Sequence, residues 1–181
     1  MWLLFCRWRC DHERDAKTAY LEEEGAKHQS LTLRDTGFLI SRQYPFIGAT
    51  PDGLLHCECC GDRLLEVECP YCCKDGLDPT GLPKQFCLAK MQERWHLKRD
   101  HQYFFQVQAQ LNVWGSHKGV FVVWNKEGIV GEERVRDEQF FAETAPSVTG
   151  FFTKGVLPEI VGECTCKTSE TSEMNPVQHF V

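Results

Sequence analysis

Residues 50–70, TPDGLLHCECCGDRLLEVECP, decide the fold of this chain. Two short apolar runs, at 54–57 and 64–69, are separated by a segment that contains a glycine, a pattern typical of a β-hairpin. Because side chains alternate along a strand, Glu66 and Glu68 point to one face, and the apolar residues beside them point to the other. The stretch therefore predicts two paired strands, one of which carries two carboxylates on a single face.

Asp52 adds a third carboxylate to this hairpin. It lies in a Pro-Asp-Gly turn directly before the first strand, and pairing of the two strands would bring it close to Glu66. Three carboxylates at one place form a hard-oxygen site suited to Mg²⁺ or Mn²⁺. Such a cation generates hydroxide from water and stabilises the charge that develops on a phosphate. The alternative is a solvent-facing strand edge for the glutamates and an ordinary turn residue for Asp52.

The remaining elements follow from the spacing of apolar residues and from turn signals. Further strands are expected at 31–34, 38–41, 120–124 and near 132–136. Helices are expected at 11–24, over most of 84–117, and from 137 onward with a disturbance at Pro146 and a continuation through 151–156. A looser segment with several Gly and Pro joins 70 to 82. We expect one domain over residues 1–163 and a polar, mobile tail over 164–181.

Composition narrows the class of protein. The 181 residues are 42% hydrophobic, enough for one domain with a sizeable core. The net charge of −6 argues against a protein that coats nucleic acid, although a site built from carboxylates is compatible with it. Eleven cysteines, an odd number without a leader peptide, argue against a secreted disulfide scaffold. No apolar stretch reaches membrane length, so we expect a soluble intracellular protein, in the nucleus or the cytoplasm.

Four motifs in a fixed order carry a resemblance to a known family. They are HERDA at 12–16, TPDGL at 50–54, LEVECP at 65–70 and YFFQVQ at 103–108. Together they resemble the YqaJ-like viral recombinase family, which includes phage lambda exonuclease and belongs to the PD-(D/E)xK nuclease superfamily. The resemblance implies an α/β (α+β) fold with a restriction-endonuclease-like core, in which helices flank a central mixed β-sheet. It also implies a metal-dependent deoxyribonuclease of the exonuclease type, acting in DNA recombination or repair.

The resemblance implies roles for individual residues. Asp52 and Glu66 match the family's metal-binding aspartate and glutamate, and Glu13 matches the acid of its first helix. Gln106 matches a glutamine beside the site, and it falls in a polar stripe of the expected helix, for which a solvated face is the alternative. The expected catalytic residues are Asp52, Glu66, Glu68 and Gln106, and the expected metal ligands are Glu13, Asp52, Glu66 and Val67.

The sequence departs from the family pattern at two positions near this site. Glu68 stands where the family has a lysine that positions and helps activate the attacking water, and Arg9 stands where a glycine is expected. The basic segment that precedes the first acidic helix in the family is missing, so we expect a domain that is N-terminally truncated relative to the family, diverged from it, or both. Two functions stay open: an active nuclease, or a catalytically impaired module that binds DNA or protein.

Contact with DNA requires a local basic surface because the chain as a whole is acidic. The expected DNA-binding residues lie on the predicted helix and are Lys84, Lys90, Arg94, Lys98 and Arg99. Their phosphate contacts would be independent of sequence and would suit duplex ends, whereas the alternative is a solvated helix face. The resemblance also allows a homo-oligomer, because relatives form a ring around DNA.

The cysteines of the hairpin suggest a second metal. Four thiolates could hold a structural zinc ion, and the set we consider is Cys57, Cys59, Cys69 and Cys72. The alternative is free buried thiols that behave as small apolar side chains. A third function follows from the zinc hypothesis, namely a zinc-stabilised interaction domain in which the carboxylates have no catalytic role.

Overall fold

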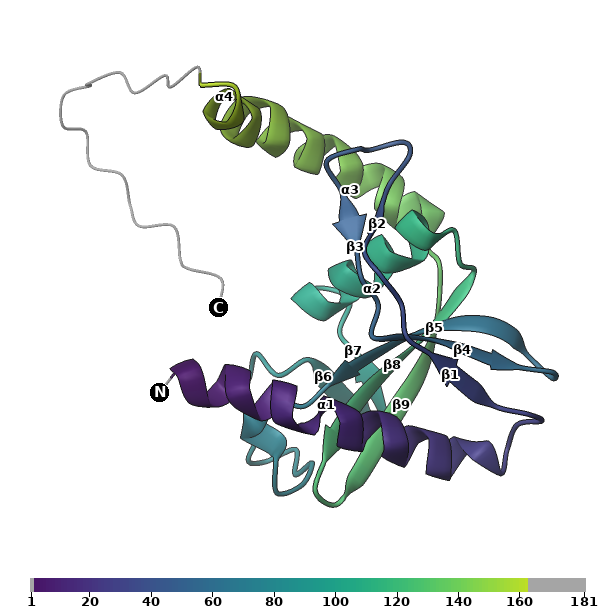
Figure 1. Cartoon of the computed structure of the whole chain (residues 1–181). Helices are drawn as coiled ribbons and strands as arrows, with labels where there is room; N and C mark the ends of the chain where they lie inside the picture. The colour runs from purple at the N-terminus through teal and green to yellow at the C-terminus, as the bar shows by residue number, and fades with distance from the viewer. Residues whose placement is uncertain (1, 163–181) are drawn as a thin grey trace. The chain divides into compact units, whose positions relative to one another are not determined.

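The fold is built around a mixed β-sheet (Figure 1). The computed structural model describes residues 2–162, with side chains from residue 7 onward. Five strands lie in the order β1 (Thr32–Arg34), β4 (Gly53–Cys57), β5 (Gly61–Glu68), β8 (Lys118–Asn125) and β9 (Gly128–Val135). Neighbouring strands are antiparallel except β5 and β8, which run parallel. The predicted class, a mixed central sheet flanked by helices, is therefore confirmed.

The predicted hairpin is formed by β4 and β5. Its first residue pair is Gly53 with Leu65 and its last is Cys57 with Gly61, so residues 58–60 make the turn. Gly61 adopts a positive φ of 72°, a conformation that a glycine takes without a steric penalty after a three-residue hairpin turn. The hairpin thus has an open end at Asp52 and Glu66 and a turn end at 58–60.

Two helices cover opposite faces of the sheet (Figure 1). On one face, α1 (Trp2–Gly25) packs Ala16 and Tyr20 against Leu65 and Val67 of β5. On the other face, α2 (Gln102–Trp114) packs an apolar stripe against the sheet, and the stripe consists of Phe104, Val107 and Leu111. The alternation along β5 therefore sends Glu66 and Glu68 to the α2 face.

The first helix is longer than predicted. It begins at Trp2 and not at Asp11, and it ends at Gly25 as expected. Asp11 lies inside the helix, where its carboxylate is 3.6 Å from Nε of Arg7 one turn earlier. An i,i+4 pair of this kind stabilises the interior of a helix.

The prediction of helix over most of 84–117 is wrong for its first half. Residues 88–97 form a hairpin of β6 (Leu88–Met91) and β7 (Arg94–Leu97), and α2 begins only at Gln102. Leu88 and Leu97 are paired across this hairpin and are both buried in the core beside α2. Their nine-residue separation comes from strand pairing and not from a helical face. The side chain of His101 caps α2 by accepting a hydrogen bond from the backbone N–H of Tyr103 (3.2 Å).

The other elements are short or lie late in the chain. They are β2 (Leu39–Ile40), β3 (Gly48–Ala49), the 3₁₀ turn η1 (Tyr71–Cys73), α3 (Glu138–Phe151), the π-helical turn η2 (Phe152–Val156) and α4 (Leu157–Ile160). The chain forms two compact units that divide between Thr144 and Ala145, inside α3. The first unit contains the whole sheet. The expected polar tail, 164–181, lies outside the described residues. Among the described helices, none combines the length and the apolar character needed to cross a membrane.

Candidate active site

Asp52 lies at the open end of the β4–β5 hairpin, where backbone pairing between the strands stops. Its Oδ2 atom accepts a hydrogen bond from the backbone N–H of Val67 (2.7 Å), so the side chain continues the ladder by one more bond. Burial raises the pKa of the Asp52 carboxyl, and the bond from Val67 opposes that rise. Asp52 is thus fixed in direction and close to β5.

Glu66 is the neighbouring acid on β5, and its side chain is buried. Each of its oxygens accepts a hydrogen bond from α2: Oε1 from the amide of Gln106, and Oε2 from the amide of Gln110 (2.7 Å). Gln106 and Gln110 are one helical turn apart, so a single face of α2 supplies both donors. Gln106 lies beside Glu66, at the position expected from the sequence.

The environment of Glu66 disfavours its charged form. Burial, followed by the nearby charge of Asp52, raises its pKa to about 8, while the bond from Gln110 works in the opposite direction. An acid in such a place ionises readily only when a cation lies close to it.

Glu68 is also buried, and its cation comes from α1. Nη2 of Arg9 lies 3.0 Å from Oε1 of Glu68 and 3.7 Å from Oε1 of Glu66, an ion pair without the alignment of a hydrogen bond. The hydroxyl of Tyr103 interacts with Glu68 and lowers the pKa of that carboxyl. Burial raises the pKa of Glu68 to about 7, and the charge of Arg9 opposes this rise. Glu68 is therefore paired with an arginine from the first helix.

Glu13 approaches the site from α1 but is less buried. Its carboxylate forms an ion pair with Lys17 (2.5 Å), and its charge raises the pKa of both Asp52 and Glu68 after the effect of burial. Glu13, Asp52 and Glu66 do not form a set in which all donor atoms lie within 4.8 Å of one another. The three acids thus share an electrostatic environment without closing around one point.

The donor chemistry of the open end fits a hard divalent cation. Carboxylate oxygens are the ligands that Mg²⁺ and Mn²⁺ prefer, and each oxygen of Glu66 keeps a lone pair beyond the one that accepts an amide. A bound cation would also offset the cost of burying two negative charges next to each other.

The predicted basic helix face does not exist, because its residues fall on a hairpin and on the segments beside it. Lys90 lies in β6 and Arg94 in β7. Nζ of Lys98 donates to the backbone carbonyl of Lys84 (2.9 Å), and Arg99 forms an ion pair with Asp137 (2.8 Å) while stacking over Phe104. A continuous patch on one helix is therefore corrected to dispersed cations, three of which (Lys90, Lys98 and Arg99) have partners within the chain.

The predicted four-thiolate zinc set is also not assembled. Cys57 and Cys59 lie at the turn end of the hairpin, whereas Cys69 and Cys72 follow the opposite end of β5. An eight-residue strand spans roughly 26 Å, so the two pairs cannot share an ion. Cys57 and Cys59 lie instead with Cys60 and His28, two residues that the spacing of cysteines did not single out.

Comparisons with known proteins agree on fold and family. The family model of the YqaJ-like viral recombinase domain matches residues 5–117. The crystal structure of an alkaline exonuclease from Laribacter hongkongensis (LHK-Exo) superposes with a TM-score of 0.59 at 22% identity, over 88% of this chain and 70% of that one. The structure of LHK-Exo in complex with dAMP gives a TM-score of 0.58 at 21% identity, over 87% and 73%. No curated protein sequence matches the chain.

Proposed function

Because the chain belongs to the YqaJ-like viral recombinase family, we propose that it is a metal-dependent deoxyribonuclease that hydrolyses phosphodiester bonds at DNA ends. The observation that carries this proposal is the meeting of Asp52 and Glu66 at the open end of the hairpin. Both acids are directed by hydrogen bonds from neighbouring elements, and both are partly or wholly withdrawn from water. Fixed, desolvated carboxylates are the arrangement that metal-assisted phosphate hydrolysis requires.

The residues that would hold Mg²⁺ or Mn²⁺ are Asp52, Glu66, Glu13 and Val67. When bound, the metal would supply a hydroxide nucleophile and would offset charge on the phosphate. The chain itself supplies the geometry. Gln106 and Gln110 fix the orientation of Glu66, and the N–H of Val67 fixes that of Asp52.

Arg9 is proposed as the cation of the site. In the family a lysine at position 68 lies close to the attacking water, but here the positive charge reaches the same strand from α1. The side chain of Arg9 is 42% exposed, so its guanidinium can contact a phosphate while it balances the buried Glu68. Arg9 would thus supply the positive charge of that lysine, while Glu68 occupies its position on the strand and holds Arg9 in place.

The same contact favours a second candidate function. Arg9 lies within 3.7 Å of both glutamates, so a protein cation already balances acids that a metal would otherwise balance. A chain in which Arg9 replaces the metal would bind DNA or protein with this fold and would not hydrolyse it. The partner in either case is proposed to be duplex DNA bound independently of sequence, with oligomer formation as in other members of the family.

One assay separates the two functions. Linear 5′-phosphorylated duplex is incubated with the protein in Mg²⁺, in Mn²⁺ and in a chelator, and both nucleotide release and duplex binding are measured. The nuclease releases nucleotides in at least one metal, stops in the chelator, and is inactive as the Asp52→Ala variant. Duplex binding without release in either metal would instead establish the binding module, and release that persists in Asp52→Ala would reject the proposed site.

A further inference from the structure

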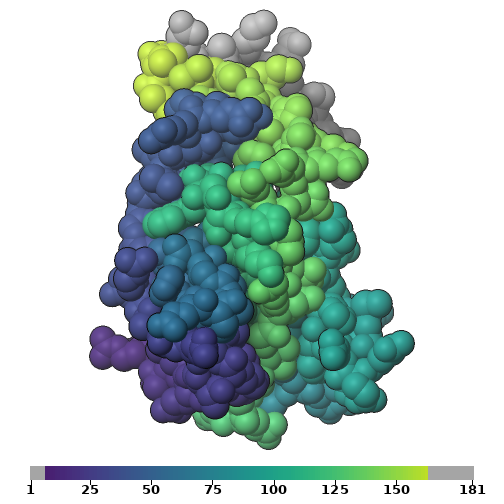
Figure 2. All heavy atoms as spheres, turned by 90° about the vertical axis from the view of Figure 1, so that its right-hand side faces the viewer, coloured from purple at the N-terminus to yellow at the C-terminus, as the bar shows by residue number. Residues whose placement is uncertain are grey.

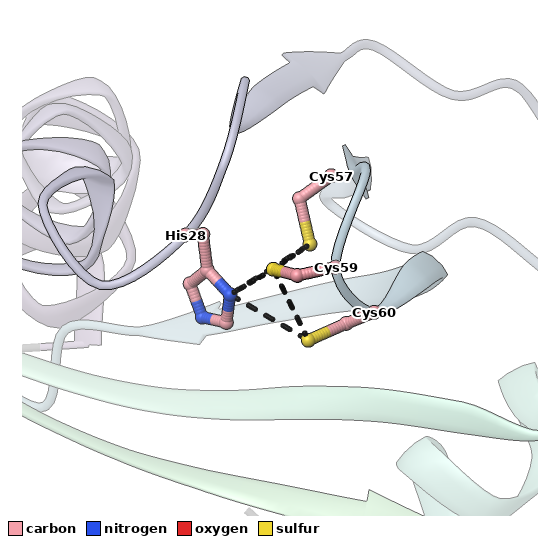
Figure 3. Close-up of side chains that lie close together, drawn as sticks. All are labelled: His28, Cys57, Cys59 and Cys60. Atoms are coloured by element: carbon pink, nitrogen blue, oxygen red, sulfur yellow. Dashed lines mark hydrogen bonds between the residues drawn. The ribbon is translucent and has the colours of Figure 1, made fainter.

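The turn end of the β4–β5 hairpin carries a compact cluster of one histidine and three cysteines. His28, Cys57, Cys59 and Cys60 offer one ligand atom each, and these atoms all lie within 4.8 Å of one another (Figure 3). Figure 2 shows this face of the molecule, where the turn of the hairpin reaches the surface next to the residues that follow α1. We propose that the cluster is a structural zinc site, separate from the carboxylates at the open end.

Strand register explains how His28 reaches the hairpin. β1 pairs antiparallel with β4, with Thr32 opposite His56, so the segment that precedes β1 lies beside the residues that follow His56. Backbone contacts extend the pairing into this region, because the N–H of Glu58 donates to the carbonyl of Gln29 (3.0 Å). The backbone next to His28 is therefore held at the turn by a contact that does not involve the thiols.

The hairpin turn brings the three thiols to one side. Cys57 is the last residue of β4, and Cys59 and Cys60 belong to the turn that closes at Gly61 with its positive φ. Figure 3 shows all three sulfur atoms directed toward the ring of His28. A turn of this length is short enough to fix its side chains with little freedom, which favours a preformed site.

The distances within the cluster match a tetrahedral zinc centre. The sulfur of Cys59 lies 3.6 Å from the sulfurs of both Cys57 and Cys60. Nδ1 of His28 lies 3.2 Å from the sulfur of Cys59, 3.7 Å from that of Cys57 and 3.6 Å from that of Cys60. A tetrahedron with ordinary Zn–S and Zn–N bonds has edges of about 3.8 Å between sulfurs and about 3.6 Å between sulfur and nitrogen.

The surroundings of the cluster also suit a bound ion. Nδ1 of His28 faces the thiols, while Nε2 on the other side of the ring lies 3.7 Å from a carboxylate oxygen of Glu24. Histidines that bind zinc commonly have such a carboxylate beyond the ring, where it fixes the tautomer. Nη2 of Arg63 lies 3.6 Å from the sulfur of Cys57 and would offset the excess negative charge of three thiolates on one Zn²⁺.

The ligand set determines the class of metal and of site. Three thiolates and one imidazole select zinc over Mg²⁺ or Mn²⁺, which prefer oxygen. Four protein ligands leave no open position for water or substrate, so the site is structural. Zinc here would join the segment after α1 to the hairpin whose other end carries Asp52.

The test is the zinc content of the full chain, purified under reducing conditions without added chelator, with the visible spectrum of the Co²⁺-substituted protein as a second measurement. We expect about one zinc ion per chain and the ligand-field bands of tetrahedral cobalt with thiolate ligands. The informative variants are Cys60→Ser and His28→Asn, and both should lose zinc and the cobalt spectrum. The matched control is Cys72→Ser, an exposed cysteine outside the cluster, which should keep both.

Two results would overturn the proposal. One is a reduced wild-type chain that contains no zinc and gives no tetrahedral cobalt spectrum, a readout that does not depend on how any variant folds. The other is loss of zinc in Cys72→Ser together with its retention in Cys60→Ser and His28→Asn. That result would show that the zinc ligands lie beyond the C-terminal end of β5, near Cys72, and not at the hairpin turn. Neither result depends on whether the protein cleaves DNA.

Discussion

The two ends of one hairpin differ in nearly every property that matters for binding a metal. The open end of β4–β5 presents carboxylates that are largely buried between the sheet and α2. The turn end presents thiols and an imidazole, most of them near the surface. Oxygen ligands suit Mg²⁺ or Mn²⁺, and sulfur with nitrogen suits Zn²⁺. One five-residue strand, β4, separates the two chemistries.

The difference in burial and in ligand type indicates a different role for the metal at each end of the hairpin. Buried acids with raised pKa values bind a metal at a cost to the stability of the metal-free fold, which is typical of functional sites. Thiols at the turn end do not destabilise the metal-free fold in this way, and a metal bound there adds to folding stability. We therefore expect the open end to carry activity and the turn end to carry stability.

The largest expected effect is on activity at the open end. Asp52→Asn keeps an oxygen that can accept from the N–H of Val67 but removes the charge, so nucleotide release should fall roughly 100- to 1000-fold. The measurement is the initial rate of nucleotide release from linear duplex.

The matched control for this prediction is Asp62→Asn. Asp62 belongs to the same hairpin, is exposed, and pairs only with His56 near the turn end (2.7 Å). Its substitution should leave the rate unchanged. Equal losses in both variants would show that the hairpin as a whole, and not the charge at its open end, is required.

The next effect concerns the pair of Arg9 and Glu68. Glu68→Lys alone places an ammonium group against the guanidinium, and Arg9→Ala alone leaves a buried acid without its cation, so each should lower the free energy of unfolding by about 1–3 kcal/mol. In the double variant the two defects should partly cancel, with a coupling energy of roughly 0.5–3 kcal/mol in urea unfolding. Alanine is preferred to glycine at position 9 because the residue lies inside α1.

Activity gives a second readout of the same pair. The double variant carries a lysine at position 68 without a competing arginine, and it should release nucleotides faster than Glu68→Lys alone. Strict additivity of the two substitutions in both measurements would show that Arg9 and Glu68 do not act together.

A smaller effect is expected at the turn end. Glu24→Gln removes the carboxylate behind His28 without removing a zinc ligand, so zinc affinity should fall roughly 10- to 100-fold in a chelator competition. Glu23→Gln is the control, because the adjacent Glu23 contacts only Lys27, at 3.9 Å. An unchanged zinc affinity in Glu24→Gln would show that the Glu24 carboxylate does not support zinc binding by His28.

A further effect, on the wild-type chain itself, is the pH dependence of stability without added Mg²⁺. The folded chain holds protons on Glu66 and Glu68 that the unfolded chain releases above about pH 4.5, because burial raises the two pKa values to about 8 and about 7. Stability should therefore fall as pH rises from 6 to 8, by about 1 kcal/mol per pH unit for each proton involved. Saturating Mg²⁺ or the Glu66→Gln substitution should reduce this slope in urea unfolding; an unchanged slope would contradict it.

Much of the open end could be predicted from sequence because its signals are local. Strand alternation places Glu66 and Glu68 on one face, and the Pro-Asp-Gly turn places Asp52 at the start of β4. Gln106 and Gln110 follow from the spacing of polar residues on α2. The charge of Arg9 could be read from the sequence, but its contact with Glu68 depends on how α1 packs across the sheet.

The turn end was only half predictable because one ligand comes from another strand pair. Cysteine spacing points to Cys57 and Cys59, but His28 reaches them only through the register of β1 with β4. The prediction of a basic helix that begins at residue 84 was wrong for a related reason. Leu88 and Leu97 lie nine residues apart and would fall on opposite sides of a helix, and the pairing of β6 with β7, which no local signal marks, places them side by side in the core.

We expect the two ends of the hairpin to bind different metals independently of each other. The most direct test measures Zn²⁺ content and Mn²⁺ binding in the same preparations of wild type, Asp52→Ala and Cys60→Ser. We predict that Asp52→Ala loses Mn²⁺ binding and keeps its zinc, whereas Cys60→Ser loses zinc. Mn²⁺ binding that is unaffected by Asp52→Ala, or zinc that is lost in that variant and retained in Cys60→Ser, would contradict the claim.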